Sequence, residues 1–368
     1  MAKSFSSAIY LDANATEPLR PEAREATMAA LEQGGNPSSV HAVGRAARAL
    51  LEDARKCVAR FADRSAECCV FTSGGTEADT LAIHALGHSI GRQVLIGATE
   101  HDAVRKAAPE AGIVPVDEQG IVKLDVLRTM LDQVPSALVC IMAANNETGV
   151  CAPLEDVAAI CREKGALLHI DAVQSAGRLC LSQEAMAGAS IALSGHKLGG
   201  PKGAGALLLP DDAPLSPLLP GGGQERGRRG GTPALPAIMG MAAALEASQT
   251  QDWDKIAQWR DDVQQRAQDV EAEIVAANVT RLPNTLNLIL PGVSSQTQLM
   301  MLDLEGFCVS SGSACSSGKV SASHVLQAMG FREQAGQALR ISLPWNVTEE
   351  EVVAFAEAYQ RMAKRLKK

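Results

Sequence analysis

The chain has 368 residues, of which 46% are hydrophobic and 21% charged, and its formal net charge at pH 7 is −8. This composition is typical of a globular protein and excludes a disordered chain, and the acidic balance leaves no basic footprint for nucleic acid. The longest apolar runs, such as ALVCIMAA at 137–144, fall far short of the roughly 20 residues that span a bilayer, so no membrane-spanning segment is expected.

The cysteines and the N-terminal sequence bear on where the protein works. The nine cysteines include no CxxC pair, which is typical of reduced thiols and speaks against a disulfide framework or a metal site. Residues 1–16 lack the apolar region of a signal peptide. We therefore expect a cytoplasmic protein without a metal.

Short apolar runs alternate with helical patterns from about residue 67 to 210, which predicts an α/β fold. The candidate strands are CCVFTS (68–73), QVLIGA (93–98), IVPV (113–116), ALVCIMAAN (137–145), LLHIDA (167–172), IALSG (191–195) and AGALLLP (204–210), and the candidate helices cover 76–91 and 154–165. Such near-continuous apolar strands are typical of a mainly parallel sheet with helices on both faces.

The remainder of the chain predicts a smaller α+β part. A loop rich in glycine, proline and arginine at 220–236 precedes one long polar helical stretch over about 237–277. Strands at 285–290, 308–312 and 339–344 then alternate with helices at 297–306, 323–330 and 349–366. We expect a large domain formed by 15–245 and a small domain formed by 1–14 and 246–368, because the chain is longer than one core usually supports.

The segment FTSGGTEADTLAI (71–83) runs from a strand through Gly74 and Gly75 into a helix that begins near Thr76. Such a turn presents backbone N–H groups and the positive end of a helix dipole, which stabilise a phosphate. The spacing of the phosphate loop of nucleotide triphosphatases is absent. The alternative is an ordinary glycine turn with Thr76 as the N-cap.

Lys197 leaves a strand inside the glycine-rich segment IALSGHKLGGPKGAGAL (191–207), between residues that can bind an anion. A lysine that loses its proton forms Schiff bases with carbonyl compounds. Ser194 and His196 lie close to it in sequence and could hold a phosphate. The alternative is a surface lysine on a glycine loop.

Asp171 ends an apolar strand in HIDAVQSAGR (169–178), with no lysine or arginine adjacent to it. A protonated pyridine nitrogen would supply the cationic partner, as in pyridoxal-phosphate enzymes. On this interpretation Gln174 donates to the phenolate oxygen of the ring, and His101, which follows another strand, stacks on it. The alternatives are an aspartate that caps the next turn and a structural histidine. Strand ends of an α/β sheet converge on one site, which favours the cofactor.

These motifs together resemble the cysteine desulfurases of the NifS/IscS type, in the class V aminotransferase family. In chain order the matching segments are YLDANAT, GNPSSVHAVGRAAR, FTSGGTEADTLAI, EHDAV, NNETGV, HIDAVQSAG, SGHKLGGPKGAGAL, GGGQERGRRGGT, SSGSACSSG, SHVLQAMG and LRISLP. The resemblance runs nearly end to end. It implies a fold-type I transferase dependent on pyridoxal 5'-phosphate, with a large domain built on a mainly parallel mixed sheet and a smaller α+β domain.

The resemblance also implies roles for single residues. Lys197 would hold the cofactor, Asp171 would pair with its ring nitrogen, and His101 would stack on the ring and move protons. The other implied cofactor-binding positions are Gly75, Thr76, Asn146, Gln174, Ser194, His196 and Thr232. Thr232 would reach the phosphate bound by the neighbouring subunit, which implies a homodimer.

The implied substrate is L-cysteine, whose carboxylate Asn36 and Arg340 would bind. Cys315, in SSGSACSSG (310–318), is similar to the nucleophile that accepts the sulfur as a persulfide while L-alanine is formed. We expect this Ser/Gly-rich loop to be mobile, so that Cys315 can reach the pocket and then turn to an acceptor, such as an iron–sulfur scaffold protein.

The sequence departs from the family pattern at a few positions. Gly230 stands where the family commonly has serine, Ala13 replaces an often polar residue, and Ala322 replaces a common proline. The chain ends at RLKK, so we do not expect it to grip a scaffold through the C-terminal extension of IscS-type members.

Other functions remain open from the sequence. A selenocysteine lyase or another β-eliminating lyase of the same fold would share Lys197 and Asp171 but would not need Cys315. A class V aminotransferase and a non-catalytic sulfur-trafficking protein are further alternatives, and the intact Lys197 speaks against the latter.

Overall fold

The computed structural model describes residues 8–211, 215–311 and 322–367. Its larger part is built on a seven-stranded sheet with the order β2-β8-β7-β6-β5-β3-β4. The strands are β2 (Cys69–Thr72), β3 (Val94–Gly97), β4 (Gly112–Val114), β5 (Leu138–Met142), β6 (Leu167–Asp171), β7 (Ala189–Ser194) and β8 (Gly205–Leu208). All pairings are parallel except those of β8, which is antiparallel to both neighbours. The predicted α/β fold and its mainly parallel sheet are confirmed.

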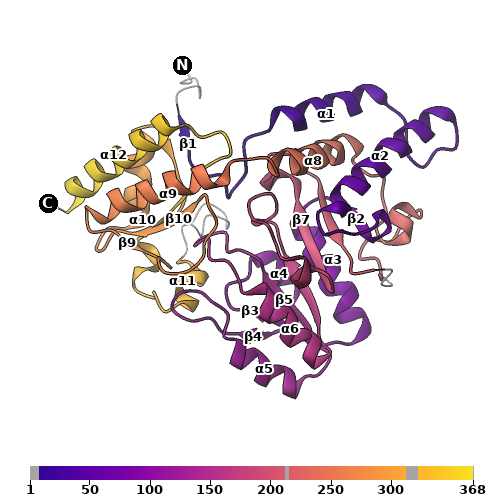
Figure 1. The fold of residues 1–368 in the computed structure, drawn as a ribbon, viewed down its shortest axis with the longest axis horizontal. Coiled ribbons are helices and arrows are strands. Elements are labelled where there is room, and N and C mark those ends of the chain that lie inside the picture. Colours follow the sequence, from indigo (N-terminus) through magenta and orange to yellow (C-terminus); the bar gives the residue numbers. More distant parts are fainter. Residues whose placement is uncertain (1–7, 212–214, 312–321, 368) are drawn as a thin grey trace.

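Helices cover both faces of this sheet (Figure 1). Strand residues such as Leu168, Ile170 and Ile191 pack into the main core with α2, α5, α6 and α8, whereas the alternate residues face α3 and α4. The helices are α1 (Pro21–Gln33), α2 (Ala42–Arg60), α3 (Gly75–Leu86), α4 (Asp102–Ala107), α5 (Leu124–Gln133), α6 (Leu154–Lys164), α7 (Gln183–Met186) and α8 (Leu235–Ser248). The strands are buried on both faces except at the edge strand β4, where Ile113 is exposed, and this burial accounts for the continuous apolar runs.

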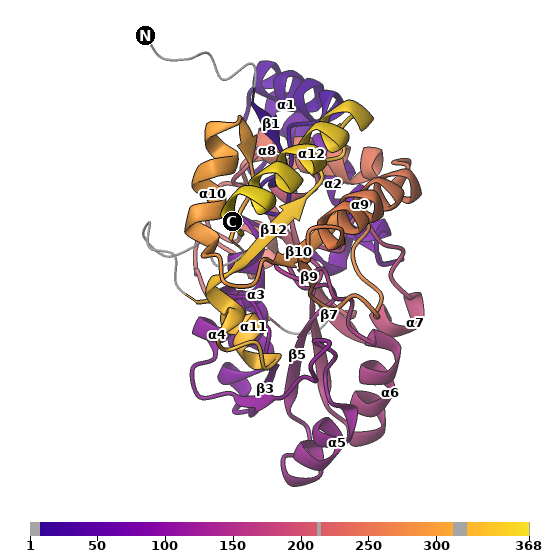
Figure 2. The same cartoon turned by 90° about the vertical axis from the view of Figure 1, so that its left-hand side faces the viewer.

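The smaller part contains an antiparallel sheet of β10 (Thr285–Ile289) between β12 (Ala338–Ser342) and β9 (Glu273–Ile274). A parallel pair, β1 (Ile9–Tyr10) with β11 (Phe307–Cys308), lies beside it. The helices α9 (Trp253–Gln268), α10 (Ser295–Leu304) and α12 (Glu349–Leu366) pack with this sheet (Figure 2). Helix α11 (His324–Ala328) is the next element after β11 among the described residues. The predicted alternation of strands and helices is confirmed here.

The helical stretch expected over about 237–277 is helical over most of its length but is not continuous. The segment forms two helices, α8 and α9, and then the short strand β9. Helix α8 packs on α1 in the larger part, whereas α9 packs on α12 in the smaller part. Asp252 starts α9, because its side chain accepts a hydrogen bond from the backbone N–H of Lys255 at 3.0 Å. The break therefore lies where the chain passes from one core to the other.

Two buried cores lie on either side of the expected domain boundary. The main core runs from Ala23 to Leu245, and the second gathers Leu11 with residues from Ile256 to Ala363. The separation of the two cores supports a domain boundary at residue 245, which stays a prediction. Within the described ranges, no helix is long and apolar enough to cross a bilayer.

The N-terminal segment crosses between the two parts and covers the carboxyl ends of the central strands. Ala13 donates its N–H to Ser342 O at 3.1 Å on the small side, and Arg20 donates its N–H to Gly199 O at 2.8 Å on the large side. Between these anchors, Glu17 donates its N–H to His196 O at 3.0 Å. This crossing brings residues 14–17 against the loop after β7.

Candidate active site

Lys197 lies on a short 3₁₀ helix, η4 (Gly195–Lys197), directly after β7. Its ammonium group donates to the backbone oxygens of Asn14 at 2.5 Å and Ala15 at 3.0 Å, both in the crossing segment. The side chain is half-buried. Lys197 is thus an amine held at the seam between the two parts and not a surface lysine on a loop.

Asp171 ends β6 and is 5% exposed. Its Oδ1 accepts the backbone N–H of Val173 at 2.9 Å, so it does cap the following turn, as the alternative interpretation proposed. Burial first, and the charge of Asp79 second, raise the pKa of Asp171 to about 7. Within the described ranges, Asp171 forms no ion pair. A carboxyl group in this state is suited to a cationic partner such as a protonated ring nitrogen.

His101 follows β3 and lies in the same electrostatic neighbourhood. Burial lowers the pKa of His101, the charge of Asp171 opposes this, and the ammonium of Lys197 adds to it. Its Nδ1 accepts the backbone N–H of Ala103 at 3.1 Å. A backbone N–H can only donate, so the neutral ring carries its proton on Nε2. Lys197, Asp171 and His101 therefore meet at one site.

The start of α3 lies against the ends of β6 and β7. A Cβ atom added at Gly75 would lie 2.6 Å from Val173 Cγ2 and 3.4 Å from Ser194 Cβ, so only glycine permits this approach. The N-cap of α3 is Gly74, and no side chain caps the helix; the interpretation of Thr76 as an N-cap is therefore wrong. Thr76 is the second helical residue and is exposed. The free N–H groups of this first turn point to an anion site.

His196 completes the side of the site near Lys197. Its Nδ1 lies 2.9 Å from Thr16 Oγ1, and burial, followed by the charges of Lys197 and Lys202, lowers the pKa of His196 to about 4. The imidazole is thus neutral at pH 7. Ser194, two residues earlier, is 3% exposed at the end of β7.

Gln174 is fixed by a buried network that sequence reasoning missed. Its Nε2 donates to Asn14 O at 2.9 Å, and its Oε1 accepts from Arg178 Nη1 at 2.6 Å. Arg178 also donates to Asn14 Oδ1 at 3.0 Å and to Glu17 Oε1 at 2.9 Å. The motifs YLDANAT and HIDAVQSAG contained Asn14 and Gln174, but no local pattern indicated that Glu17 and Arg178 pair across 161 residues.

Arg340 on β12 joins the site from the small part. It is 4% exposed, its Nη1 donates to Asn146 O at 3.1 Å, and its Nη2 pairs with Asp12 Oδ1 at 2.6 Å. Its Nε is buried and has no hydrogen-bond partner among the described residues. Asn146 is half-buried and offers its backbone oxygen to both Arg340 and Asn14.

Asn36 and Thr232 are not brought to this site by any described contact. Asn36 is exposed between α1 and α2, and its Oδ1 accepts the N–H of Ser38 at 2.9 Å. Thr232 is also exposed. Its loop is tied to the first turn of α3 by Arg229, which pairs with Glu77 at 2.8 Å. The roles expected of Asn36 and Thr232 stay predictions.

Cys315 and the expectation of a mobile loop lie outside the described residues, but both flanks of that segment touch the site. Ser310 pairs with Arg340 through the backbone, with N–O distances of 2.6 and 3.1 Å. On the other side, Ser323 donates to Glu147 Oε2 at 2.5 Å, and His324 Nε2 donates to Glu100 O at 3.0 Å. The flanks of the Cys315 segment are therefore anchored next to Asn146 and His101.

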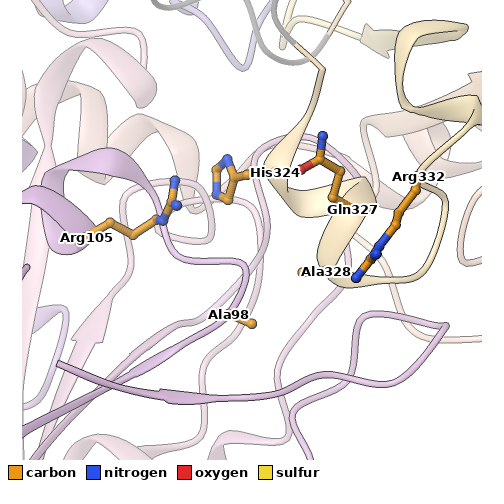
Figure 3. A pocket seen from close by; sticks show the side chains of 6 residues that line it. All are labelled: Ala98, Arg105, His324, Gln327, Ala328 and Arg332. Atoms are coloured by element: carbon orange, nitrogen blue, oxygen red, sulfur yellow. The ribbon is translucent and has the colours of Figure 1, made fainter.

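A separate cavity of about 510 Å³ lies beside α4 and α11 (Figure 3). Arg105, His324 and Arg332 give its lining a basic character, and Gln327 and two alanines complete it. None of the predicted site residues lines this cavity, so it is distinct from the site around Lys197.

The donor groups at the site fit pyridoxal phosphate. The start of α3 at Gly75, with Ser194 and His196, offers donors for an anionic phosphate. The buried Asp171 offers a carboxyl group for a ring nitrogen, and Lys197 offers an amine for an aldehyde. A Cβ at Gly75 would clash with Val173 Cγ2, so the glycine lets the start of α3 approach the turn after β6.

Comparison with known proteins places the chain in a family. Residues 9–355 match the model described as aminotransferase class-V. The cysteine desulfurase of Cereibacter sphaeroides is 39% identical over 359 residues, which are 94% of this chain and 92% of that protein. The cysteine desulfurase IscS of Dictyoglomus turgidum is 35% identical and covers 98% of this chain and 95% of its own length.

A solved structure, the NifS-like protein from Rickettsia africae, superposes with a TM-score of 0.89 at 32% identity, covering 97% of this chain and 99% of that one. Proteins of this family are pyridoxal-phosphate enzymes. Sequence, fold and site thus agree, and the chain belongs to the class V aminotransferase family and, within it, to the cysteine desulfurases of the NifS/IscS type.

Proposed function

We propose that the protein uses pyridoxal phosphate to convert L-cysteine to L-alanine and transfers the sulfur to Cys315. The Cβ–S bond of the substrate breaks and an S–S bond to the Cys315 sulfur forms, so L-cysteine and the Cys315 thiol give L-alanine and a Cys315 persulfide. The observation that carries this proposal is that Lys197, Asp171 and His101 share one site in a chain of the cysteine desulfurase family.

Each group of the site has a part in holding the cofactor. We assign the aldehyde to Lys197 and the ring nitrogen to Asp171, with His101 on the ring face. The phosphate is assigned to Gly75, Thr76, Ser194 and His196, and the ring substituents to Asn146 and Gln174. When bound, pyridoxal phosphate supplies an electron sink for the charge left at the substrate's Cα.

The proton transfers fall to His101 and Lys197. His101 is neutral and holds its proton on Nε2, because Nδ1 accepts from Ala103 N. At that atom it can donate a hydrogen bond to the substrate, and it becomes a proton donor only after the ring has taken up a second proton on Nδ1 in place of the Ala103 contact. The amine of Lys197, whose Nζ is held at the Asn14 and Ala15 carbonyls, would serve as the base that takes the substrate's Cα proton.

Arg340 is suited to the substrate carboxylate. Its Nε has no partner among the described residues, and a buried guanidinium N–H without an acceptor is costly. A carboxylate that binds there satisfies Nε and forms parallel hydrogen bonds with the guanidinium. Asp12 keeps the guanidinium oriented at 2.6 Å until the substrate arrives. Asn36 is the second proposed contact.

The partners and the cellular location also belong to the proposal. Thr232 is exposed on a loop that Arg229 and Glu77 fix near α3, which supports its reaching a neighbouring subunit in a homodimer. The persulfide would pass to an acceptor protein such as an iron–sulfur scaffold, in the cytoplasm.

The test is to incubate the cofactor-loaded protein with L-cysteine and measure alanine together with the mass of the peptide containing Cys315. We expect one extra sulfur atom on Cys315 and an equal amount of alanine. The variant Cys315→Ser separates the alternatives, because a desulfurase loses sulfur transfer whereas a β-eliminating lyase keeps its turnover. Full turnover of Cys315→Ser, with no sulfur on the wild-type peptide, would contradict the proposal.

A further inference from the structure

Behind Asp171 the structure buries a carboxyl group and an imidazole that the proposed reaction does not use. Asp79 on α3 is 1% exposed, and His169 on β6 is fully buried. Asp79 Oδ1 lies 3.1 Å from His169 Nε2, and His169 Nδ1 lies 2.8 Å from Oγ of Ser190 on β7. These three side chains form one hydrogen-bonded chain through three elements of the fold.

This hydrogen-bonded chain lies on the cofactor side of the sheet. Residues two apart on a strand face the same side, so His169 lies beside Asp171 on the face that α3 covers, while Leu168 and Ile170 face the main core. Helix α3 begins at Gly75, and Asp79 follows about one turn later. The helix that starts at the phosphate side therefore also brings a carboxyl group beneath Asp171.

The hydrogen bonds limit where the protons of this group can lie. Burial lowers the pKa of His169 to about 4, so its ring is neutral and has one N–H. With this hydrogen on Nε2, the ring donates to Asp79, and Nδ1 accepts the hydroxyl proton of Ser190. Burial raises the pKa of Asp79, but the bond from His169 stabilises its charged form. This arrangement satisfies both ring nitrogens with Asp79 as a carboxylate. A protonated Asp79 that donates to Nε2, with Nδ1–H donating to Ser190, satisfies them equally, so the negative charge of Asp79 is part of the proposal that the experiment below tests.

Several groups act on Asp171. Burial and, from α3, the charge of Asp79 raise its affinity for a proton, whereas the Val173 N–H lowers it. His169, on the same strand, and His101, after β3, lower it only when they are protonated. Glu100 also lies after β3, and its own pKa is raised by burial and then by Asp171 and Asp79. On η4, the ammonium of Lys197 acts on the adjacent His101.

We propose that Asp79, held by His169 and Ser190, is a positioning residue whose negative charge keeps the proton between Asp171 and the ring nitrogen of bound pyridoxal phosphate. Two carboxylates close together each raise the proton affinity of the other. Without the charge of Asp79, Asp171 would release that proton at lower pH. The inference rests on the proposed function, because it concerns the same cofactor site.

A purely structural role is the competing explanation. Asp79 and His169 would then only tie α3 to β6 and β7, and their loss would lower the melting temperature without changing the protonation of the ring. The two explanations differ in one observable, which is the pH at which the ring nitrogen loses its proton.

The experiment uses the holoenzyme reconstituted with pyridoxal phosphate labelled with nitrogen-15 in the ring. The nitrogen chemical shift is followed against pH for the wild type and for Asp79→Asn, which keeps the shape of the side chain and removes its charge. We expect the midpoint of deprotonation to fall by about one pH unit or more in the variant. An unchanged or higher midpoint would overturn the inference.

Two further variants complete the test. His169→Phe removes the hydrogen-bond donor to Asp79, and Asp79 then takes up a proton. The midpoint of ring-nitrogen deprotonation should therefore fall even though Asp79 is intact. This variant decides the question if Asp79→Asn does not fold. Asp53→Asn, at an exposed surface pair with Lys56, is the matched control and leaves the midpoint unchanged. A wild type that binds no cofactor refutes the proposed function, whereas normal binding with an unmoved midpoint refutes only this inference.

Discussion

Arg178 is the residue whose loss should damage the support of the site most. Its Nη2 lies 2.9 Å from Glu17 Oε1, and both side chains are 2% exposed. Its Nη1 orients Gln174 at 2.6 Å and Asn14 at 3.0 Å, and Asn14 in turn holds Lys197. The variant Arg178→Met keeps most of the side-chain volume but leaves the Glu17 carboxylate buried without its cation.

Removing one partner of a buried ion pair costs about 3–5 kcal/mol of unfolding free energy. For a domain of this size each kcal/mol corresponds to about 2–4 °C, so the melting temperature should fall by roughly 6–20 °C. Burial raises the pKa of Glu17 and Arg178 opposes this, so in the variant Glu17 binds its proton more tightly when folded than when unfolded. The loss of stability should therefore be larger at pH 8 than at pH 5.

The assay is thermal unfolding of the apoprotein at both pH values. Arg361→Met is the matched control, because Arg361 pairs with Glu305 at the surface, with side chains 61% and 38% exposed, and its loss should change stability by less than about 0.5 kcal/mol. The double variant Glu17→Leu/Arg178→Met should recover part of the loss. A fall for Arg178→Met no larger than that for Arg361→Met would refute the reasoning.

Three other substitutions test separate parts of the site. Gly75→Ala places a Cβ 2.6 Å from Val173 Cγ2 and should weaken pyridoxal-phosphate binding about tenfold or more in an absorbance titration. Gly188→Ala is its control, because nothing lies within 4 Å of the added Cβ. Equal affinities of the two variants for pyridoxal phosphate would count against a tight phosphate side. Because the pKa of Asp171 is about 7 when folded, against an ordinary 3.8, its charge destabilises the apoprotein at pH 8. Asp171→Asn should raise the stability there by about 2–4 kcal/mol in thermal unfolding, a gain that disappears toward pH 4; a lower melting temperature at pH 8 would contradict this sign. Arg340→Lys loses the paired N–H donors and should raise KM for L-cysteine about tenfold or more, with a smaller effect on kcat. The control Arg332→Lys, at an exposed position, should leave KM unchanged. Equal KM values of the two variants in steady-state kinetics would exclude Arg340 as the carboxylate binder.

The sheet could be predicted because its central strands are buried on both faces. Runs such as 137–145 and 167–172 are mainly apolar, and each contains a strand of the parallel sheet, β5 and β6. The boundary between α8 and α9 could not be read from the same pattern, because both segments have helical sequences. What separates them is that α8 packs in one core and α9 in the other, which depends on tertiary structure.

The residues at the strand ends could likewise be predicted, since Asp171 and Ser194 end β6 and β7 and Lys197 follows directly. The groups that hold them could not. Glu17 and Arg178 pair across 161 residues, and Asp79 meets His169 across 90. An acidic residue on a helix normally indicates a solvent-exposed face, and only the fold shows that Asp79 is buried.

The central claim is that Lys197, and no other amine, captures the cofactor beside Asp171. The most direct measurement is to load the protein with pyridoxal phosphate, reduce the bond to lysine with borohydride and identify the labelled peptide by mass. Exposed Lys202, five residues away, serves as the internal control. The account predicts stoichiometric label on Lys197 and none on Lys202. The account would be contradicted if the label lay on Lys202, if it were spread over surface lysines, or if no lysine were labelled.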